Sequence, residues 1–261
     1  MIRVLLLLFT FLSAVSADSL KIAGTFLSMN YEETAKNGNF LDSEKSDFDD
    51  ILGLKLEYVK VLGSGYGGSN ESSLGLSIDY SRGDSNYDGF LQSTSSTILI
   101  PFKSTTENTI IDPKIRWNEI NRGKSYDVGV FTSLGYRYWE RNLGSQYGYK
   151  EEYSWFYGDV GLKALFHDVN WHIGFEVAYQ LAYKPQLHAE INGGLDFDLG
   201  NTSGYYYEIP LSYDINKNYS LEVSYKVNHW DIDASNVVGG YQEPQSVTNN
   251  QKINIGLVIK W

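Results

Sequence analysis

Four histidines are the side chains in this sequence best suited to acid–base chemistry near neutral pH. One of them, His188, stands close in the sequence to three carboxylates, Glu190, Asp196 and Asp198. A histidine among carboxylates can hold a cation or exchange protons, although this spacing selects no particular metal. A solvated acidic loop is the alternative, and the formal charge of -11 favours it. The same interpretation applies to an acidic segment that contains Asp42, Glu44, Asp47, Asp49 and Asp50.

A second set of charged residues recurs at alternate positions opposite runs of apolar residues. Its members are Asp127, Arg137, Asp159, Lys163, Glu176, Glu222 and Lys226. Alternate residues of a strand share one face, so this set predicts a polar face behind an apolar one. In a small barrel that face is the lumen, where opposite charges pair because unpaired burial is costly. The sequence therefore predicts a plug of ion pairs, with a selective conduit or a catalytic cluster as the alternative.

The strands that would position these residues are clearest in the second half of the chain. Apolar residues alternate over 126–138, 156–166, 171–183, 205–213 and 219–227. The first of these runs has Tyr126 and Tyr138 at its two ends, as interfacial aromatics would be placed. Strands of soluble β-sandwiches average about five or six residues, so these longer runs favour a membrane barrel over a periplasmic sandwich.

The connections between these strands alternate in length. Tight turns are expected at 167–170 and 215–218, and long loops at 142–149 and 231–249. Short periplasmic turns and long extracellular loops are typical of outer-membrane barrels. The alternating run 187–199 falls on the extracellular side, where it predicts a hairpin-like extension or, alternatively, an additional pair of barrel strands.

The first half of the chain is less regular. Strands are expected over 20–31, 52–58 and 74–80, and one more crosses somewhere within 110–120. Pro101 and Pro113 lack a ladder donor, which predicts a bulge, an edge or a loop at both positions, and 92–102 is expected to be a loop. With the segment 252–261, the sequence predicts an all-β, antiparallel up-and-down transmembrane barrel of ten strands, with twelve as the alternative.

The two ends of the chain indicate the class of protein to which it belongs. Residues 1–17 combine Arg3, an apolar stretch and small residues before position 17, which predicts a signal peptide that leaves a barrel domain over 18–261. Apolar residues alternate through the last segment, which closes on Trp261. A chain with these ends resembles bacterial outer-membrane β-barrel proteins. The resemblance implies outer-membrane localisation among lipid and lipopolysaccharide, and insertion machinery that recognises the strand ending at Trp261.

The ten-strand count and the segment 135–139 are similar to the omptin-like barrels, whose named members are surface proteases. That family pairs an Asp-x-Asp with an Asp-x-His to activate water. Asp-x-Asp occurs here at 47–49, 196–198 and 231–233. The residues two before the histidines are Leu165, Asn170, Gln186 and Val227, so the histidine half is missing. A His-x-Ser arrangement, as in outer-membrane lipid hydrolases, is missing as well.

The amino-acid composition excludes some kinds of site and partner. The aromatic content of 15% with 25 glycines suits long strands, and the lack of cysteine excludes disulfides and thiolate metal sites. The acidic charge argues against nucleic acid as a partner, and no cofactor is expected. The sequence thus predicts a non-enzymatic outer-membrane barrel with a filled polar lumen and acidic extracellular loops for surface interaction. A surface hydrolase with its site at the extracellular mouth and a narrow channel are the alternatives.

Overall fold

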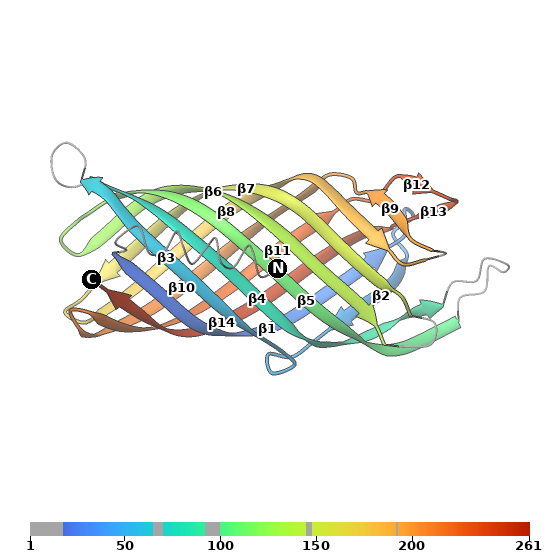
Figure 1. Ribbon diagram of the computed structural model, residues 1–261, viewed down its shortest axis with the longest axis horizontal. Helices are drawn as coiled ribbons and strands as arrows, with labels where there is room; N and C mark the ends of the chain where they lie inside the picture. Colours follow the sequence, from blue (N-terminus) through green and yellow to red (C-terminus); the bar gives the residue numbers. More distant parts are fainter. Residues whose placement is uncertain (1–17, 65–69, 92–99, 145–147, 192) are drawn as a thin grey trace.

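The computed structural model describes residues 18–64, 70–91, 100–144, 148–191 and 193–261, so the expected signal segment 1–17 lies outside it. The chain forms one closed antiparallel barrel with a ring of ten strand positions (Figure 1). In chain order the ring contains β1 (Ser19–Thr34), β2 (Phe40–Lys45) followed by β3 (Ile51–Ser64), β4 (Asn70–Leu91), β5 (Ile100–Asn121), β6 (Tyr126–Leu143), β7 (Lys150–His167), β8 (Trp171–Ala189), β10 (Thr202–Asn216), β11 (Tyr219–Ile232) and β14 (Gln245–Lys260).

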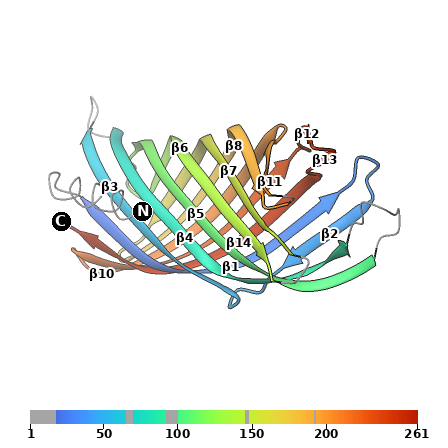
Figure 2. The same ribbon diagram turned by 45° about the vertical axis from the view of Figure 1, so that its right-hand side comes forward.

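The ring closes because β14 pairs with both β1 and β11. Strands β2 and β3 occupy a single position, since each pairs with β1 and with β4. Closure leaves no unpaired sheet edge, which the interior of a bilayer demands. The strands are inclined to the long axis of the barrel (Figure 2), as a closed sheet requires. The prediction of a ten-stranded up-and-down barrel is confirmed.

Three short strands lie at the end of the barrel opposite the C-terminus (Figure 1). Strand β9 (Leu195–Asp198) pairs with the end of β8, while β12 (Val237–Val238) and β13 (Tyr241–Gln242) form a separate hairpin. The run 187–199 is therefore the predicted hairpin extension and adds no strand to the ring. No helix in the described part of the chain has the length and hydrophobicity to cross a membrane.

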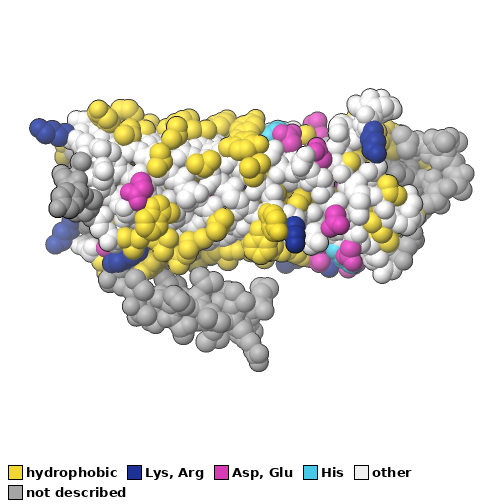
Figure 3. Space-filling model, turned by 90° about the horizontal axis from the view of Figure 1, so that it is seen from above, with side chains coloured by type: hydrophobic (Ala, Val, Ile, Leu, Met, Phe, Trp, Pro, Cys, Tyr) yellow, Lys and Arg dark blue, Asp and Glu magenta, His cyan; other side chains and the backbone are white. Residues whose placement is uncertain are grey.

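An apolar belt surrounds the part of the barrel nearer the C-terminus. Leu134, Val160 and Leu221 on its outer face are 68%, 63% and 51% exposed. Figure 3 shows hydrophobic side chains over this part and most of the acidic ones toward the opposite end. We call the edge of the belt farther from the C-terminus its upper edge. It is marked by Phe26, Leu52, Tyr80, Phe156, Tyr183 and Tyr205. We take the part of each strand within the belt as its membrane-spanning segment, and the strands continue well beyond it.

In the last strand, alternate residues face lipid and lumen in the order that the sequence predicts. Ile255 points outward and is exposed, while Lys252 and Asn254 are buried on the inner face. Apolar residues toward lipid and polar ones toward the lumen are the usual pattern of such strands. The same parity extends to neighbouring β1, where Ile22 is exposed and Lys21 is buried.

Strands β4 and β5 correct the predictions of a strand over 74–80, a loop over 92–102 and a strand within 110–120, because both strands are much longer. Each has 22 residues, and their pairing runs without interruption from Asn70 and Asn121 to Leu91 and Ile100. Positions 100–102 therefore belong to β5 rather than to the expected loop over 92–102, while 92–99 lie outside the described residues.

Pro113 lies in the middle of β5, where a bulge, edge or loop was expected. Its partner on β4 is Ile78, but the ladder between β5 and β6 is interrupted from Ile111 to Lys114. The strand tolerates proline because only the ladder toward β6 loses a hydrogen bond, while the ladder toward β4 stays continuous.

Candidate functional site

Arg137, Asp159 and Glu176, three of the predicted lumen residues, lie on inward faces and meet partners from β5. Arg137 Nη1 lies 3.5 Å from Asp112 Oδ2, and Asp159 Oδ2 lies 3.5 Å from Lys114 Nζ. Glu176 Oε2 accepts a hydrogen bond from Arg116 Nη1 at 2.9 Å. Each pair joins a cation to a carboxylate across the lumen or along its wall, so the charges largely neutralise one another.

The other four predicted residues divide between the lumen and its rim. Lys163 donates to Asn118 Oδ1 at 3.1 Å, and Glu222 pairs with Lys21. Lys226 Nζ lies 3.9 Å from the centre of the Tyr206 ring. Asp127 sits apart from these groups, at the end of the barrel near the chain termini, where Arg122 Nη1 donates to its Oδ2 at 2.5 Å.

Sequence reasoning missed most of the partners because they come from the first half of the chain. They are Lys21, Asp79, Asp112, Lys114 and Arg116, all on β1, β4 or β5. Lys252 donates to Asp79 at 3.3 Å across more than half of the sequence. The even positions of β5 point inward, and extending the alternation of Ile111 and Ile115 through Pro113 would have placed Asp112 and Lys114 in the lumen.

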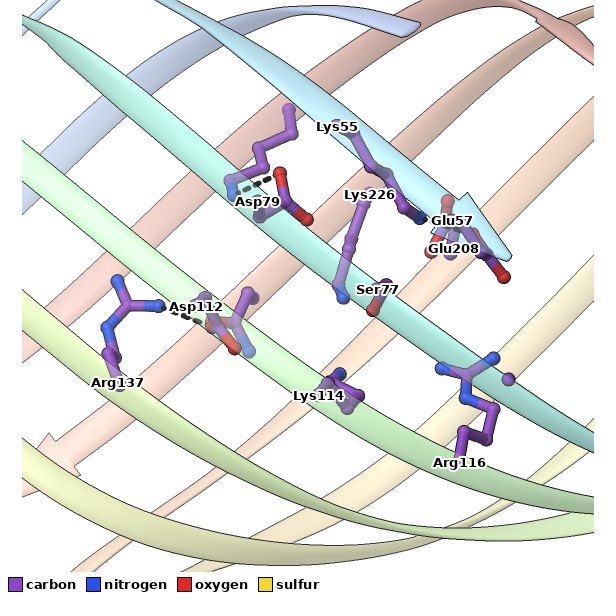
Figure 4. A pocket seen from close by; sticks show the side chains of 13 residues that line it. Lys55, Glu57, Ser77, Asp79, Asp112, Lys114, Arg116, Arg137, Glu208 and Lys226 are labelled. Carbon is purple, nitrogen blue, oxygen red and sulfur yellow. Dashed lines mark hydrogen bonds and ion pairs between the residues drawn. The ribbon is translucent and has the colours of Figure 1, made fainter. Parts of the chain in front are cut away.

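Small cavities lie in the membrane-level lumen between described residues. One of ≈ 40 Å³ lies between Asp79, Asp112 and Lys226 (Figure 4), and one of ≈ 180 Å³ reaches Ser19 and Val258 near the chain termini. Both are lined by Lys55, Glu57, Arg116 and Glu208. Figure 4 shows these side chains pointing toward one another from several strands. The first cavity has room for only a few water molecules, so ion pairs occupy most of the cross-section.

Above the belt, a buried arginine surrounded by carboxylates lies in the lumen. The Arg141 guanidinium lies 2.7 Å from Glu44 Oε1, 2.7 Å from Glu151 Oε2 and 3.4 Å from Glu33 Oε1. Arg141 is 1% exposed and Glu44 is 0% exposed. A guanidinium with several carboxylate partners satisfies its fixed fork of donors without water.

Aromatic rings pack around this group. The ring centres of Trp139 and Tyr153 are 5.0 Å apart, those of Tyr31 and Trp139 are 5.3 Å apart, and Arg141 Cζ lies 4.1 Å from the centre of the Tyr31 ring. A further carboxylate, Glu243, comes from the segment before β14 and accepts a hydrogen bond from Tyr153 Oη at 2.5 Å. We call Glu33, Glu44, Arg141, Glu151, Glu243 and their ring neighbours Tyr31, Trp139 and Tyr153 the outer plug.

The outer plug corrects the expectation of a fully solvated loop around position 44. Glu44 belongs to β2 and points into the barrel, and Asp42 on the same strand is half-buried. Burial of Glu44 is possible because Arg141, 97 positions away, neutralises it. Asp47, Asp49 and Asp50 are exposed, as expected.

Carboxylates outnumber cations in the outer plug, and burial next to other carboxylates raises the pKa of Glu33, Glu151 and Glu243. Burial, reinforced by the nearby Asp42, raises the pKa of Glu33 to about 8. Burial likewise raises the pKa of Glu151 to about 7 and that of Asp42 to about 6, against the opposing effect of Arg141. These groups lie above the belt, outside the membrane-spanning segments. Protonated carboxyls therefore replace missing cations in this part of the molecule.

The predicted extracellular cluster is spread along the outer surface rather than gathered at one point. His188 Nδ1 lies 2.7 Å from Asp196 Oδ1, but Glu190 pairs with Lys150 at 3.3 Å and Asp198 lies beside Gln186. Among the described residues, no group of three or more histidine, aspartate or glutamate side chains is arranged to hold a metal ion.

The histidines also differ in position. His229, like His188, lies above the belt on the outside, with Asn249 and Asp231 as partners. His167 and His172 lie at the opposite end of the barrel and contact each other. In the described ranges no hydroxyl group hydrogen-bonds to any of these rings, so no histidine-activated serine or threonine is assembled.

Comparison with known proteins bears on the fold. No family model matches the sequence, and no curated protein sequence matches it either. The structure is similar to the outer membrane protease OmpT from Escherichia coli, with a TM-score of 0.57 and 10% identity over 95% of this chain and 99% of that one. The translocator domain of the autotransporter NalP from Neisseria meningitidis gives a TM-score of 0.46 and 10% identity, over 99% of this chain and 94% of that one. With its closed ring, apolar belt and polar lumen, the chain has the fold of a bacterial outer-membrane β-barrel, similar in architecture to the omptin-like barrels.

Proposed function

We propose that this protein is a non-enzymatic barrel of the bacterial outer membrane, closed to permeation, that presents an acidic end to the surroundings of the cell. The observation that carries the proposal is the outer plug. Its arginine, carboxylates and rings are buried above the membrane, and ion pairs occupy the lumen beneath them. Lipid and lipopolysaccharide would surround the belt, and the insertion machinery would recognise the strand that ends at Trp261.

Planar-bilayer recording tests the closed lumen. Purified wild-type protein should insert without conductance steps at neutral pH, because the buried side chains of the outer plug would fill the narrow bore. A porin recorded in the same bilayers provides the positive control. Regular conductance steps from the wild type would contradict the proposal and favour the narrow channel.

The surface that the barrel would present is acidic. Exposed carboxylates above the belt include Asp47, Asp49, Asp50, Glu190, Asp196, Asp198 and Asp233, and the exposed cations there are fewer, among them Lys36, Arg82 and Lys103. Such a surface attracts cationic partners through long-range, salt-sensitive forces.

Binding of an oligolysine peptide to proteoliposomes tests this surface. We expect binding that weakens as salt rises, and a lower affinity when Asp47, Asp49 and Asp50 are replaced together by asparagine. The variant Asp168→Asn, which removes a charge from a turn at the opposite end, serves as the control and should leave binding unchanged. Salt-independent binding, or no effect of the triple replacement, would argue against a role for the acidic end.

A further inference from the structure

Two histidines face each other at the rim of the barrel nearest the chain termini. His167 ends β7, His172 lies near the start of β8, and the two are paired across the turn between these strands. Their Nδ1 atoms are 3.1 Å apart. The side chains are 24% and 20% exposed, so the space between them is open to solvent at the rim.

The other nitrogen of each ring contacts a carboxylate. His167 Nε2 lies 2.8 Å from Asp127 Oδ2 on β6, and His172 Nε2 lies 3.1 Å from Asp214 Oδ2 on β10. A nitrogen next to a carboxylate carries the ring proton, since a lone pair there would be repelled. When the rings are neutral, both are therefore held as Nε2–H tautomers, which leaves two Nδ1 lone pairs directed at the same space.

We infer that this pair binds a divalent transition-metal ion of the kind that imidazole prefers, such as Zn²⁺ or Cu²⁺. Two nitrogens each about 2.0–2.1 Å from a metal and 3.1 Å apart subtend about 98° at the ion. That angle lies between the cis angle of a square or octahedral site and the tetrahedral angle. The pair supplies two protein donors and leaves the remaining positions to water.

The surroundings of the pair have the features of a metal site. Metal-binding histidines usually donate their second N–H to a carboxylate, which orients the ring and makes it a stronger ligand. Asp127 and Asp214 occupy this position on the two sides of the pair. Contacts of this kind would tie the hairpin of β7 and β8 to β6 and β10.

The charges around the rim would also favour a cation between His167 and His172. Asp127 has Arg122 as its cationic partner, and Arg122 in turn pairs with Glu71 at 2.5 Å. Asp214 has Lys260 as its cationic partner, at 2.7 Å. From Glu71 to Lys260 the contacting charges thus alternate in sign up to the two imidazoles, and a cation bound between the imidazoles would lie between Asp127 and Asp214 and complete the alternation.

Calorimetric titration of the folded wild type in detergent with ZnCl₂ tests this inference. We expect one ion per chain, with the same affinity in the control variants His188→Ala and His229→Ala. His167→Ala and His172→Ala should each lose more than a factor of ten in affinity. Asp214→Asn, which keeps both ligands, should lose about 10–100-fold, as expected for a group that orients a ligand.

Electron paramagnetic resonance of the Cu²⁺-loaded wild type provides a readout that does not depend on the variants folding. Hyperfine coupling to two imidazole nitrogens is the expected signature. Three results would overturn the inference: no zinc binding by the wild type at millimolar concentration, unchanged binding in folded His167→Ala, or a proton shared between the two Nδ1 atoms in ¹⁵N spectra that zinc does not displace.

Discussion

At the scale of single residues, Arg141 is the side chain on which the outer plug depends most. It is the cation in contact with Glu33, Glu44 and Glu151, all of them buried. Replacing Arg141 by methionine keeps much of its apolar stem but leaves these carboxylates without a partner. We expect a loss of about 3–5 kcal/mol in the free energy of unfolding, measured in urea at neutral pH.

The matched control is Arg82→Met. Arg82 also pairs with a glutamate, Glu107, at 2.9 Å, but it lies on the solvated outer surface. Exposed ion pairs add little to stability, so the free energy of unfolding should stay near that of the wild type. Equal losses of unfolding free energy in the two variants would show that the buried Arg141 ion pairs stabilise the fold no more than an exposed pair does.

Leu221 tests the orientation of a membrane-spanning strand. It points outward from β11 within the belt and is 51% exposed to the lipid side. Leu221→Arg should cost about 2–4 kcal/mol of unfolding free energy in a lipid bilayer, because the charge must be moved out of the hydrocarbon. Asp231→Arg, on the same face of β11 but above the belt, should change the free energy far less. An unchanged unfolding midpoint in Leu221→Arg would overturn the register.

At the scale of elements, the projecting ends of β1, β2 and β7 carry the carboxyls whose pKa values are raised. The folded state keeps protons on Glu33 and Glu151 that the unfolded chain releases near pH 4.5, the ordinary value for a glutamate. Stability from these groups is therefore complete below that pH. It falls as pH rises toward about 8 for Glu33 and about 7 for Glu151.

We expect the free energy of unfolding to decrease between pH 5 and pH 8 for the wild type. The double variant Glu33→Gln with Glu151→Gln, which mimics the protonated state, should show a flatter profile over the same range. Urea unfolding in detergent at a series of pH values measures both. A wild-type profile that stays level or rises over this range would contradict the assignment of buried, protonated carboxyls.

Most strands could be predicted from the sequence where they cross the belt, but not where they continue above it. Strands β6, β7 and β8 alternate because one face meets lipid and the other meets the polar lumen. Above the belt both faces of β4 are largely polar, with Asp84 and Asp88 outward and Ser85 inward, so no hydrophobic period marks the strand. The register of strand β5 was also hard to predict, because a proline such as Pro113 usually indicates a break in a strand.

The candidate site was only partly predictable for a related reason. Alternation assigned Arg137, Asp159 and Glu176 to inward faces, but it could not identify partners across the barrel. The outer plug escaped prediction because a buried glutamate such as Glu44 is indistinguishable in sequence from its exposed acidic neighbours. Its burial depends on Arg141, which only the closed fold brings near.

At the scale of the whole molecule, the protein is a tall barrel with an apolar belt nearer the C-terminus and acidic side chains gathered toward the opposite end (Figure 3). The folded barrel should resist detergent and migrate differently on gels before and after heating, since its backbone hydrogen bonds close on themselves. Identical migration of heated and unheated samples, together with recovery in the soluble periplasmic fraction, would contradict a membrane barrel.

Substituted-cysteine labelling can test whether the lumen is closed on the extracellular side, because the chain has no cysteine of its own. Ser77→Cys places a thiol in the lumen beneath the outer plug, and Asp196→Cys places one on the outer surface. A membrane-impermeant thiol reagent added to intact cells should modify the cysteine at position 196 and leave the one at position 77 unmodified. Modification of both at similar rates would show that the lumen is open to the outside.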